Sequence, residues 1–228
     1  MGVSKGVFSG KVVIDLTNDT VTADKLYEGV TAHGADGETI TGTMAGKSDN
    51  NIAKQVDANA ESVAVSADDF PEGITSIRDY AFYESPCSSV EIPSTVTHIG
   101  RQSFSYAGSL ASVTLPGTIT AIGFAAFMSC AKLTDITLPS GLETIDDYAF
   151  KGCRLTSLDV PASVKSIGQW AIEGGIPVTV RATTPPSITS GTFVGAPSHI
   201  YVPASAVDTY KAATGWSDYS SIIEAITE

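Results

Sequence analysis

The chain has few charged side chains and very few basic ones. Charged residues make up 17% of its 228 residues, and 13 Lys and Arg stand against 25 Asp and Glu, for a formal net charge of -12. Binding to a phosphate backbone requires clustered Lys and Arg, and here they are scattered. Nucleic acid is therefore excluded as an expected partner, and adsorption to anionic membranes is disfavoured.

Long apolar runs and a leader-like start are also missing. No run approaches the roughly 18 apolar residues of a transmembrane helix. The start, MGVSKGVFSGKVVIDL, lacks the uninterrupted run of about 7 to 15 apolar residues found in a secretory signal. Gly6 stands where an N-myristoylation site requires Ser or Thr. We therefore predict no secretory signal, no N-myristoylation and no membrane insertion.

Histidine, a common metal ligand, is rare and dispersed. His33, His98 and His199 lie in separate sections of the chain, and none has a partner at metal-ligand spacing. Ser, His and Asp occur without any motif that would gather them into a catalytic set. We therefore predict that the chain is not an enzyme and has no catalytic, metal-binding or cofactor-binding residues.

What the chain has instead is an internal repeat headed by proline. The prolines follow one another at spacings of 22, 23, 23 and 22 residues. The units share the pattern P-x-x-[VIL]-x-x-I-x-x-x-x-[FI], then a variable stretch, then L-x-x-[VIL]-x-[LVI]. A period of about 20 to 29 residues with leucine-like positions is the range of leucine-rich repeat solenoids. The heading residues are Pro71, Pro93, Pro116, Pro139 and Pro161.

Three apolar columns predict how these units stack. Residues 112–115, SVTL, and their equivalents ending at Ile92, Leu138 and Val160 alternate exposed and buried positions, so each predicts a short strand in a parallel sheet. One unit alone could not bury its apolar side. We predict a mainly β solenoid of about five 22–23-residue coils, with almost no long helix before residue 204. The other columns are Ile77, Ile99, Ile122, Ile145 and Ile167, and Phe82, Phe104, Phe127, Phe150 and Ile172.

The three cysteines fit this repeat as core residues. Cys130 and Cys153 each follow a column Phe by three residues, and Cys87 takes the position that Leu110 has in the next unit. Free cysteine behaves as a small apolar side chain. A disulfide between Cys130 and Cys153 on adjacent coils is conceivable, but the odd cysteine count argues against it.

Two elements of the repeat, I-G-x-x-x-F and L-x-x-[VI]-x-L-P, run over residues 62–181. They resemble BspA-type leucine-rich repeats, which are found in bacterial surface and secreted proteins and in some phage proteins. The resemblance implies a solenoid used for binding.

The tail, residues 200–223, resembles the segment that commonly closes such arrays. Its residues predict a last strand from Ile200 to Val202 and then an amphipathic helix that buries Val207 and Tyr210. An uncovered strand edge invites aggregation, so a terminal unit must cap the stack. We expect three further residues to fold over the open end: Trp216, Tyr219 and Ile222.

Residues 1–44 follow a different pattern. Residues 11–16 and 38–43 predict strands, and Thr22 fits the N-cap of a short helix that ends near Tyr27. The pattern I-D-L-T-x-D-T-V-T-x-x-K-L-x-x-G, continued by G-x-x-I-T-G-T-M, resembles a short N-terminal module of structural proteins in phages and prophages. The resemblance implies a small α+β module that docks to other virion proteins.

The segment between this module and the repeat is polar and lacks the repeat pattern. Ile52, Val56 and Val63 could share one helical stripe, which would make an oligomerising helix and a homo-oligomer. We favour a solvated linker. The predicted domains are a docking module at 1–44, a linker at 45–61, the solenoid at 62–181 and a C-terminal capping segment at 182–228.

Two sets of outward positions compete as a ligand-binding surface. One set lies two and three residues before the Phe column and varies between units. Its aromatic and Arg side chains are of the kind that anchors protein interfaces. The alternative explanation is that these side chains only cover the core. The other is the outward side of the strands, whose hydroxyl and acidic groups suit a glycan or a cation. We favour the first set, Tyr80, Arg101, Phe124, Tyr148 and Trp170. The second set is Ser89, Glu91, Ser112, Thr114, Asp135, Thr137, Ser157 and Asp159.

Two functional hypotheses follow. The first is a phage virion structural protein of the tail, baseplate or capsid, assembled in the host cytoplasm, which displays the solenoid to bind a bacterial surface protein or glycan. It would contact other virion proteins through residues 1–44. The alternative is a bacterial cell-surface or secreted adhesin or interaction module.

Overall fold

The computed structural model describes the backbone of residues 5–8, 11–15, 31–33, 39–41 and 63, and both backbone and side chains of residues 64–70 and 72–227. The expected helix at 22–27 and most of the expected linker lie outside the described residues. Packing divides the chain into two units, Met1–Asp49 with Gln55–Asp57, and Asn50–Lys54 with Ala58–Glu228.

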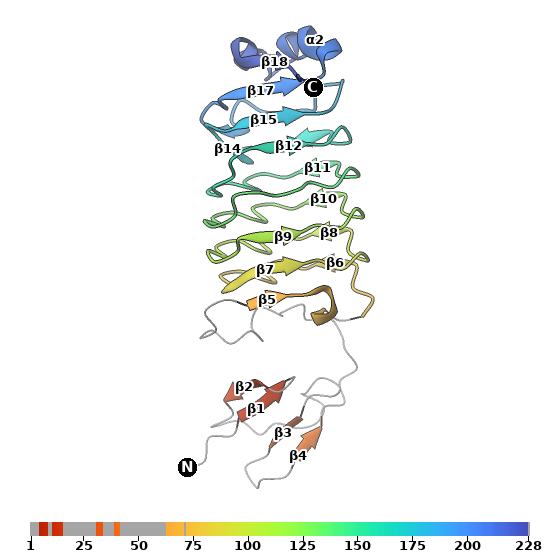
Figure 1. Ribbon diagram of the computed structural model, residues 1–228, viewed down its shortest axis with the longest axis vertical. Helices are drawn as coiled ribbons and strands as arrows, with labels where there is room; N and C mark the ends of the chain where they lie inside the picture. Colours follow the sequence, from red (N-terminus) through yellow and green to blue (C-terminus); the bar gives the residue numbers. More distant parts are fainter. Residues whose placement is uncertain are drawn as a thin grey trace. The chain divides into compact units, whose positions relative to one another are not determined.

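The first unit contains a four-stranded antiparallel sheet in the order β2-β1-β3-β4 (Figure 1). β2 (Lys11–Asp15) and β4 (Thr39–Thr41) lie where the sequence predicts strands. The other two strands, β1 (Lys5–Phe8) and β3 (Thr31–His33), were not predicted.

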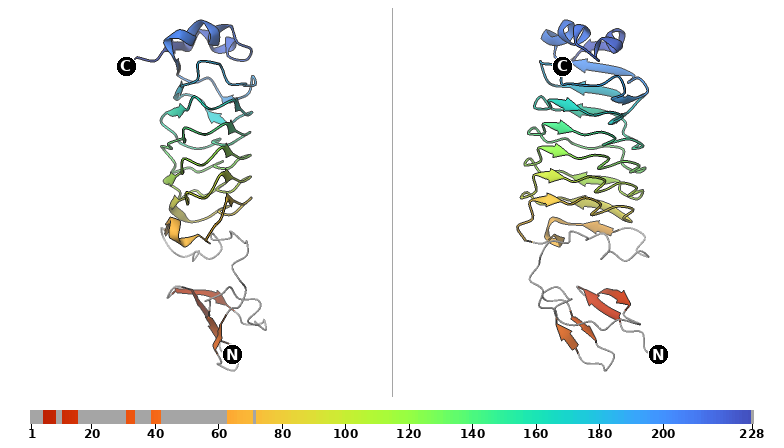
Figure 2. Two further views of the ribbon diagram at one scale, coloured as in Figure 1. Left: turned by 90° about the vertical axis from the view of Figure 1, so that its right-hand side faces the viewer. Right: turned by 180° about the vertical axis from the view of Figure 1, so that it is seen from behind.

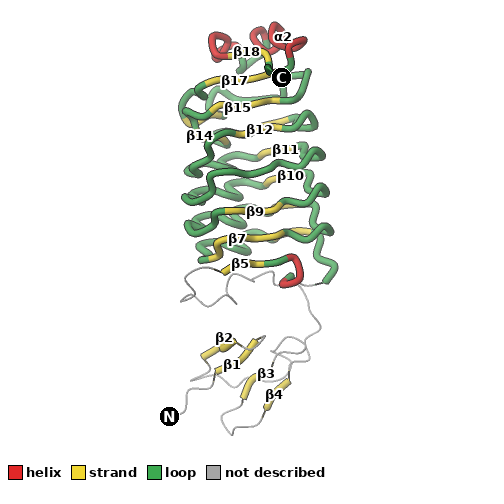
Figure 3. Tube along the Cα trace, viewed as in Figure 1, coloured by secondary structure: helices red, strands yellow, loops and turns green. Residues whose placement is uncertain are grey.

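The second unit is a solenoid of short parallel strands joined by turns, as predicted (Figures 1 and 3). The isoleucine column forms a five-stranded parallel sheet, in which Ile pairs with Ile from coil to coil. Sequence analysis predicts burial for this column but no strand, because only two residues per coil join the sheet. Its members are β6 (Ser76–Ile77), β8 (His98–Ile99), β10 (Ala121–Ile122), β11 (Thr144–Ile145) and β13 (Ser166–Ile167).

The predicted strand column forms two parallel sheets instead of one. The first has the order β5-β7-β9 and the second the order β12-β15-β17-β18. The strand predicted to end at Leu138 is wrong, because residues 135–138 pair with neither neighbour. The strands are β5 (Val63–Val65), β7 (Cys87–Glu91), β9 (Ser112–Thr114), β12 (Leu158–Val160), β15 (Pro177–Val180), β17 (His199–Val202) and β18 (Ile223–Ala225). A further parallel pair joins β14 (Ile172–Glu173) to β16 (Phe193–Val194).

The phenylalanine column forms the centre of the core. The rings of Phe82, Phe104, Phe127 and Phe150 are fully buried and stack in sequence. Their centroids lie 4.8, 5.1 and 5.6 Å apart, with interplanar angles of 10°, 5° and 4°. Because each ring packs on the ring of the next coil, no coil can move without disturbing its neighbours.

Proline marks the corner at the start of a coil, and glycine allows a close backbone approach in the three coils that contain the I-G element. After each described heading proline, the N–H three residues on donates to the proline carbonyl, for example Val96 to Pro93 at 3.0 Å. The glycine of the I-G element then lies against the preceding coil: a Cβ added at Gly123 would lie 2.7 Å from the carbonyl oxygen of Ile99. Glycine is therefore needed there for close backbone approach.

A short helical segment closes the stack (Figure 2). It consists of η3 (Ala204–Ala206), α2 (Val207–Ala212) and η4 (Ser217–Ile222). As predicted, Tyr210 and Trp216 are buried. The polar atom of each side chain makes a hydrogen bond: Tyr210 Oη donates to Ala182 O at 2.9 Å, and Trp216 Nε1 donates to Pro186 O at 2.8 Å. The parallel pairing continues through β17 and β18, so these residues extend the stack while they cap it.

Candidate binding face

The candidate ligand residues lie in the turn segment of each coil, between the isoleucine sheet and the strand column. The position two before the Phe column has a left-handed backbone in all five coils. Left-handed conformation is unfavourable for residues with a Cβ. It is held here by a ladder of hydrogen bonds to the next coil, such as Tyr80 N–H to Arg101 O at 2.9 Å and Gln102 N–H to Phe124 O at 2.8 Å. The φ values are 60° at Tyr80, 49° at Gln102, 52° at Ala125, 62° at Tyr148 and 54° at Trp170.

Four of the five predicted residues form one contact chain with Lys151. The guanidinium of Arg101 lies 4.5 Å from the centre of the Phe124 ring, and that ring lies 5.4 Å from the ring of Tyr148. Tyr148 meets Trp170 edge to face at 5.1 Å. Lys151 Nζ lies 4.6 Å from the Trp170 ring and 5.1 Å from the Tyr148 ring. The cations and rings hold one another in place, because a cation is attracted to the face of an aromatic ring.

The fifth predicted residue, Tyr80, belongs to a second cluster. Its ring lies 5.8 Å from that of Tyr83, which in turn lies 5.7 Å from the ring of Tyr106, both edge to face. These three rings are 48%, 37% and 47% exposed. Together with Trp170, which is 38% exposed, they are the exposed large apolar side chains of the described chain.

Sequence analysis missed Tyr83, Tyr106 and Lys151. All three lie one or two residues after a Phe of the core column, in the stretch that varies most between units. For Tyr83 and Tyr106 the sequence does contain a signal, because an aromatic residue outside every core column is expected to be exposed. The eight residues of the two clusters are called the aromatic face below: Tyr80, Tyr83, Arg101, Tyr106, Phe124, Tyr148, Lys151 and Trp170.

The competing strand face is polar over most of its length. Seven of its eight predicted residues are exposed, and Ser89 is half-buried. Arg181 binds Asp159 with two nitrogens, at 2.6 to 3.1 Å. On β17 of the same sheet, the His199 ring stacks on the Tyr201 ring, with ring centres 5.8 Å apart. Sequence analysis did not predict this pair.

The thiols are packed as predicted, in the core. Cys130 Sγ donates to Phe104 O at 3.1 Å, and Cys153 Sγ donates to Phe127 O at 3.0 Å. Hydrogen bonding to Cys153 and burial raise the pKa of Cys130, and burial raises the pKa of Cys87. A thiol is reactive as the thiolate, so these environments make Cys87 and Cys130 poor nucleophiles.

Other chemistry is sparse in the described part of the chain. Within residues 64–70 and 72–227, no three His, Cys, Asp or Glu side chains come together in a way that could hold a metal ion. His98 instead shares a hydrogen bond with Thr97 Oγ1 at 2.8 Å. None of the helices that the structure describes is both long and apolar enough to cross a membrane.

Several solved structures are similar to the chain. The Treponema pallidum leucine-rich repeat protein TpLRR is 25% identical to the chain, with a TM-score of 0.50 over 63% of this chain and 73% of that one. A leucine-rich repeat protein of Bacteroides ovatus is 21% identical, with a TM-score of 0.47. A leucine-rich cell surface protein of Faecalibacterium prausnitzii is 24% identical, with a TM-score of 0.43 over 62% of this chain and 34% of that one. The match covers 63% of this chain and 52% of the B. ovatus protein, so the chain spans about half the length of that protein.

Family comparison identifies the repeat itself. Residues 59–176, more than half of the chain, match the model of the BspA type leucine-rich repeat region in six copies, one more than the proline-headed units. The match does not reach residues 11–44, so the resemblance of that segment to a phage module gains no support from it. None of the curated proteins matches the chain. The chain belongs to the BspA-type leucine-rich repeat family.

Proposed function

We propose that this chain is a non-enzymatic adhesion or interaction module that acts at a bacterial surface or after secretion, and that it binds a protein or glycan through the aromatic face. BspA-type repeats occur in bacterial surface and secreted proteins, which supports the location. The comparisons contain nothing that favours a virion, so the adhesin hypothesis replaces the virion hypothesis as the preferred one.

One observation carries the proposal: bulky aromatic side chains occupy backbone positions that do not favour them. Of the eight non-glycine residues with positive φ in the described chain, four are aromatic: Tyr80, Tyr106, Tyr148 and Trp170. Glycine would adopt this conformation without strain. Strained positions that place a large exposed side chain on one surface support a functional reason for the side chain.

The composition of the aromatic face agrees with this role. Tyr, Trp and Arg bury a large area at interfaces with a small loss of conformational entropy, and they dominate binding hot spots. Arg101 and Lys151 are already placed against rings, so less side-chain freedom would be lost on binding. The competing explanation, that these rings only cover the core, fits half-buried Phe124 and Tyr148 better than Tyr80 and Tyr106, which are nearly half exposed.

The test is binding of the fluorescently labelled full chain to intact bacterial and epithelial cells. We expect Tyr148→Ser with Trp170→Ser to weaken binding by about thirtyfold or more, because the loss of even one hot-spot residue costs about 2 kcal/mol or more. A matched control, His199→Ser with Tyr201→Ser, removes the stacked pair of the strand face. All variants are checked for an unchanged thermal midpoint.

A third variant, Asp135→Ala with Asp159→Ala, decides between the two faces. Loss of binding only in this variant would move the ligand to the strand face. Full binding by all three variants would mean that the aromatic residues serve packing alone and would refute the proposal.

A further inference from the structure

The strand column is interrupted at one coil. β9 ends the first sheet and β12 begins the second, and between them residues 135–138 run without a strand partner. The N–H and C=O groups of these four residues make no hydrogen bond to any other described residue. The same coils remain joined elsewhere, because β10 pairs with β11 and Phe127 stacks on Phe150. The coils are therefore joined along two sides, and on the third side their hydrogen bonds stop at Thr134, whose carbonyl accepts from Thr156 N–H at 3.0 Å.

The interrupted segment still packs on the core. Ile136 and Leu138 are only 6% and 7% exposed, although their backbone is unpaired. Backbone groups that lie away from water are almost always hydrogen-bonded, so four consecutive unpaired residues are unusual in a folded domain. Water or a ligand must satisfy them. This segment thus presents a strip of alternating donors and acceptors that the intact strands β9 and β12 do not offer.

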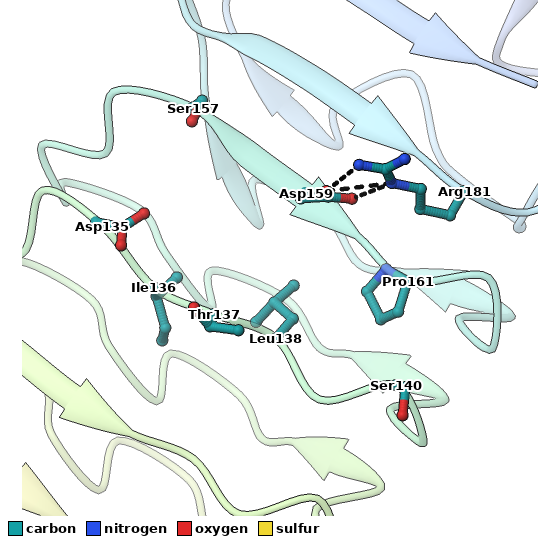
Figure 4. Close-up of a pocket in the computed structure, with 9 residues that line it drawn as sticks. All are labelled: Asp135, Ile136, Thr137, Leu138, Ser140, Ser157, Asp159, Pro161 and Arg181. Atoms are coloured by element: carbon teal, nitrogen blue, oxygen red, sulfur yellow. Dashed lines mark hydrogen bonds and ion pairs between the residues drawn. The ribbon is translucent and has the colours of Figure 1, made fainter. Parts of the chain in front are cut away.

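A cavity of about 370 Å³ opens along this strip (Figure 4). Its volume falls within the range of small-molecule sites, about 300 to 1,000 Å³. The far wall carries the Asp159–Arg181 ion pair, which Figure 4 shows between the strand of Asp159 and the residue after β15. The cavity is called the gap pocket and is lined by Asp135, Ile136, Thr137, Leu138, Ser140, Ser157, Asp159, Pro161 and Arg181.

The chemistry of this lining selects for a neutral ligand rich in hydroxyl groups. Asp135 has no ion-pair partner among the described residues, so the pocket keeps a negative charge that repels anions. The two carboxylates are too few to hold a metal ion by themselves. A hydroxyl group both donates and accepts, so it can pair with an N–H, a carbonyl or a carboxylate of the strip. Leu138 and Pro161 supply apolar surface for the C–H groups of a sugar ring.

We propose that the gap pocket binds a short neutral saccharide, whose hydroxyl groups pair with the free backbone groups of residues 135–138 and with the side chains of Asp135, Thr137 and Asp159. This site lies in the strand column, whereas the aromatic face lies in the turn segment of each coil. The two proposals can therefore fail separately.

The test is an NMR titration of the isotopically labelled full chain with four neutral disaccharides at millimolar concentration: maltose, cellobiose, lactose and N,N′-diacetylchitobiose. At least one is expected to shift the amide signals of Ile136 and Leu138 and those of β12, while the amides of β6 and β8 stay in place. If none of the four shifts these signals, the proposal fails. Shifts produced by an extended peptide and by no disaccharide would also overturn it.

Variants make the test specific to the pocket. Thr137→Val is expected to weaken the disaccharide affinity by about tenfold, the effect of one lost hydrogen bond to a charged or well-placed polar group. Thr114→Val, at the equivalent position of the intact strand β9, is the matched control and should leave the affinity unchanged. Equal weakening in both variants would show that the signal does not come from the gap pocket.

Amide hydrogen exchange tests the gap itself without any ligand. The amides of Ile136 and Leu138 should exchange much faster than that of Val113 in β9, because only the latter lies in a paired strand. Protection of all three to the same degree would show that the sheet is continuous in solution and would overturn the proposal.

Discussion

Phe127→Ala tests the core on which both proposed binding surfaces are built. The Phe127 ring is fully buried and stacks on Phe104 at 5.1 Å and on Phe150 at 5.6 Å. Burial of such a side chain contributes about 1.5 to 3 kcal/mol, and each ring pair adds about 0.5 to 1.5 kcal/mol. These contributions agree with the loss of about 3 to 5 kcal/mol that follows truncation of a buried Phe.

The assay is urea unfolding of the full chain, followed by circular dichroism. A loss of this size should lower the unfolding midpoint by roughly 1.5 to 2.5 M, given a typical slope of about 2 kcal/mol per molar urea. Tyr106→Ala is the matched control, because it removes a ring of similar size from the adjacent coil where it is 47% exposed. The control should shift stability by less than about 1 kcal/mol. An unchanged midpoint for Phe127→Ala, or equal shifts in both variants, would refute the assigned core.

Four further substitutions, one of them a control, and one chemical probe test separate parts of the structure. Ser103→Ala should raise the free energy of unfolding by about 1 kcal/mol, and the thermal midpoint with it, because the Ser103 hydroxyl is buried without a hydrogen-bond partner. Gly123→Ala should destabilise the fold while Gly117→Ala, whose added Cβ meets nothing within 4 Å, should not. Burial raises the pKa of Tyr210, so its contribution to stability is complete below about pH 10 and falls as pH rises further; Tyr210→Phe should flatten that alkaline loss. A thiol reagent at neutral pH should leave Cys130 unmodified until urea is added.

The periodic part of the fold was predictable because one structural unit repeats. A residue that is buried in one coil is buried at the same position in the next, and the columns of Ile77 and Phe82 therefore appear in the sequence as fixed spacings. The closing tail was predictable for a related reason, since Tyr210 and Trp216 are large apolar residues placed after the last strand.

The candidate site was only partly predictable. The spacing identifies Tyr148 and Trp170 as a variable column, but it does not show the left-handed backbone that turns them outward, because that conformation depends on hydrogen bonds to the following coil. Tyr83 and Tyr106 occupy different repeat positions and meet only in three dimensions.

The sheet gap left no mark in the repeat pattern. Residues 135–138, DITL, have the same alternation as residues 112–115, SVTL, and the sequence therefore predicts a strand in both places. Pairing depends on the distance between coils, which the shape of the turns sets and which side-chain alternation does not encode.

Site-specific photo-crosslinking on intact cells tests most directly whether the aromatic face makes the binding contact. The full chain is prepared with Trp170→benzoylphenylalanine or, on the strand face outside the gap pocket, with Thr114→benzoylphenylalanine, and each form is irradiated after binding to cells. We predict a covalent adduct of defined mass from position 170 and none from position 114. An adduct from position 114 alone would contradict the proposal that the aromatic face is the binding surface.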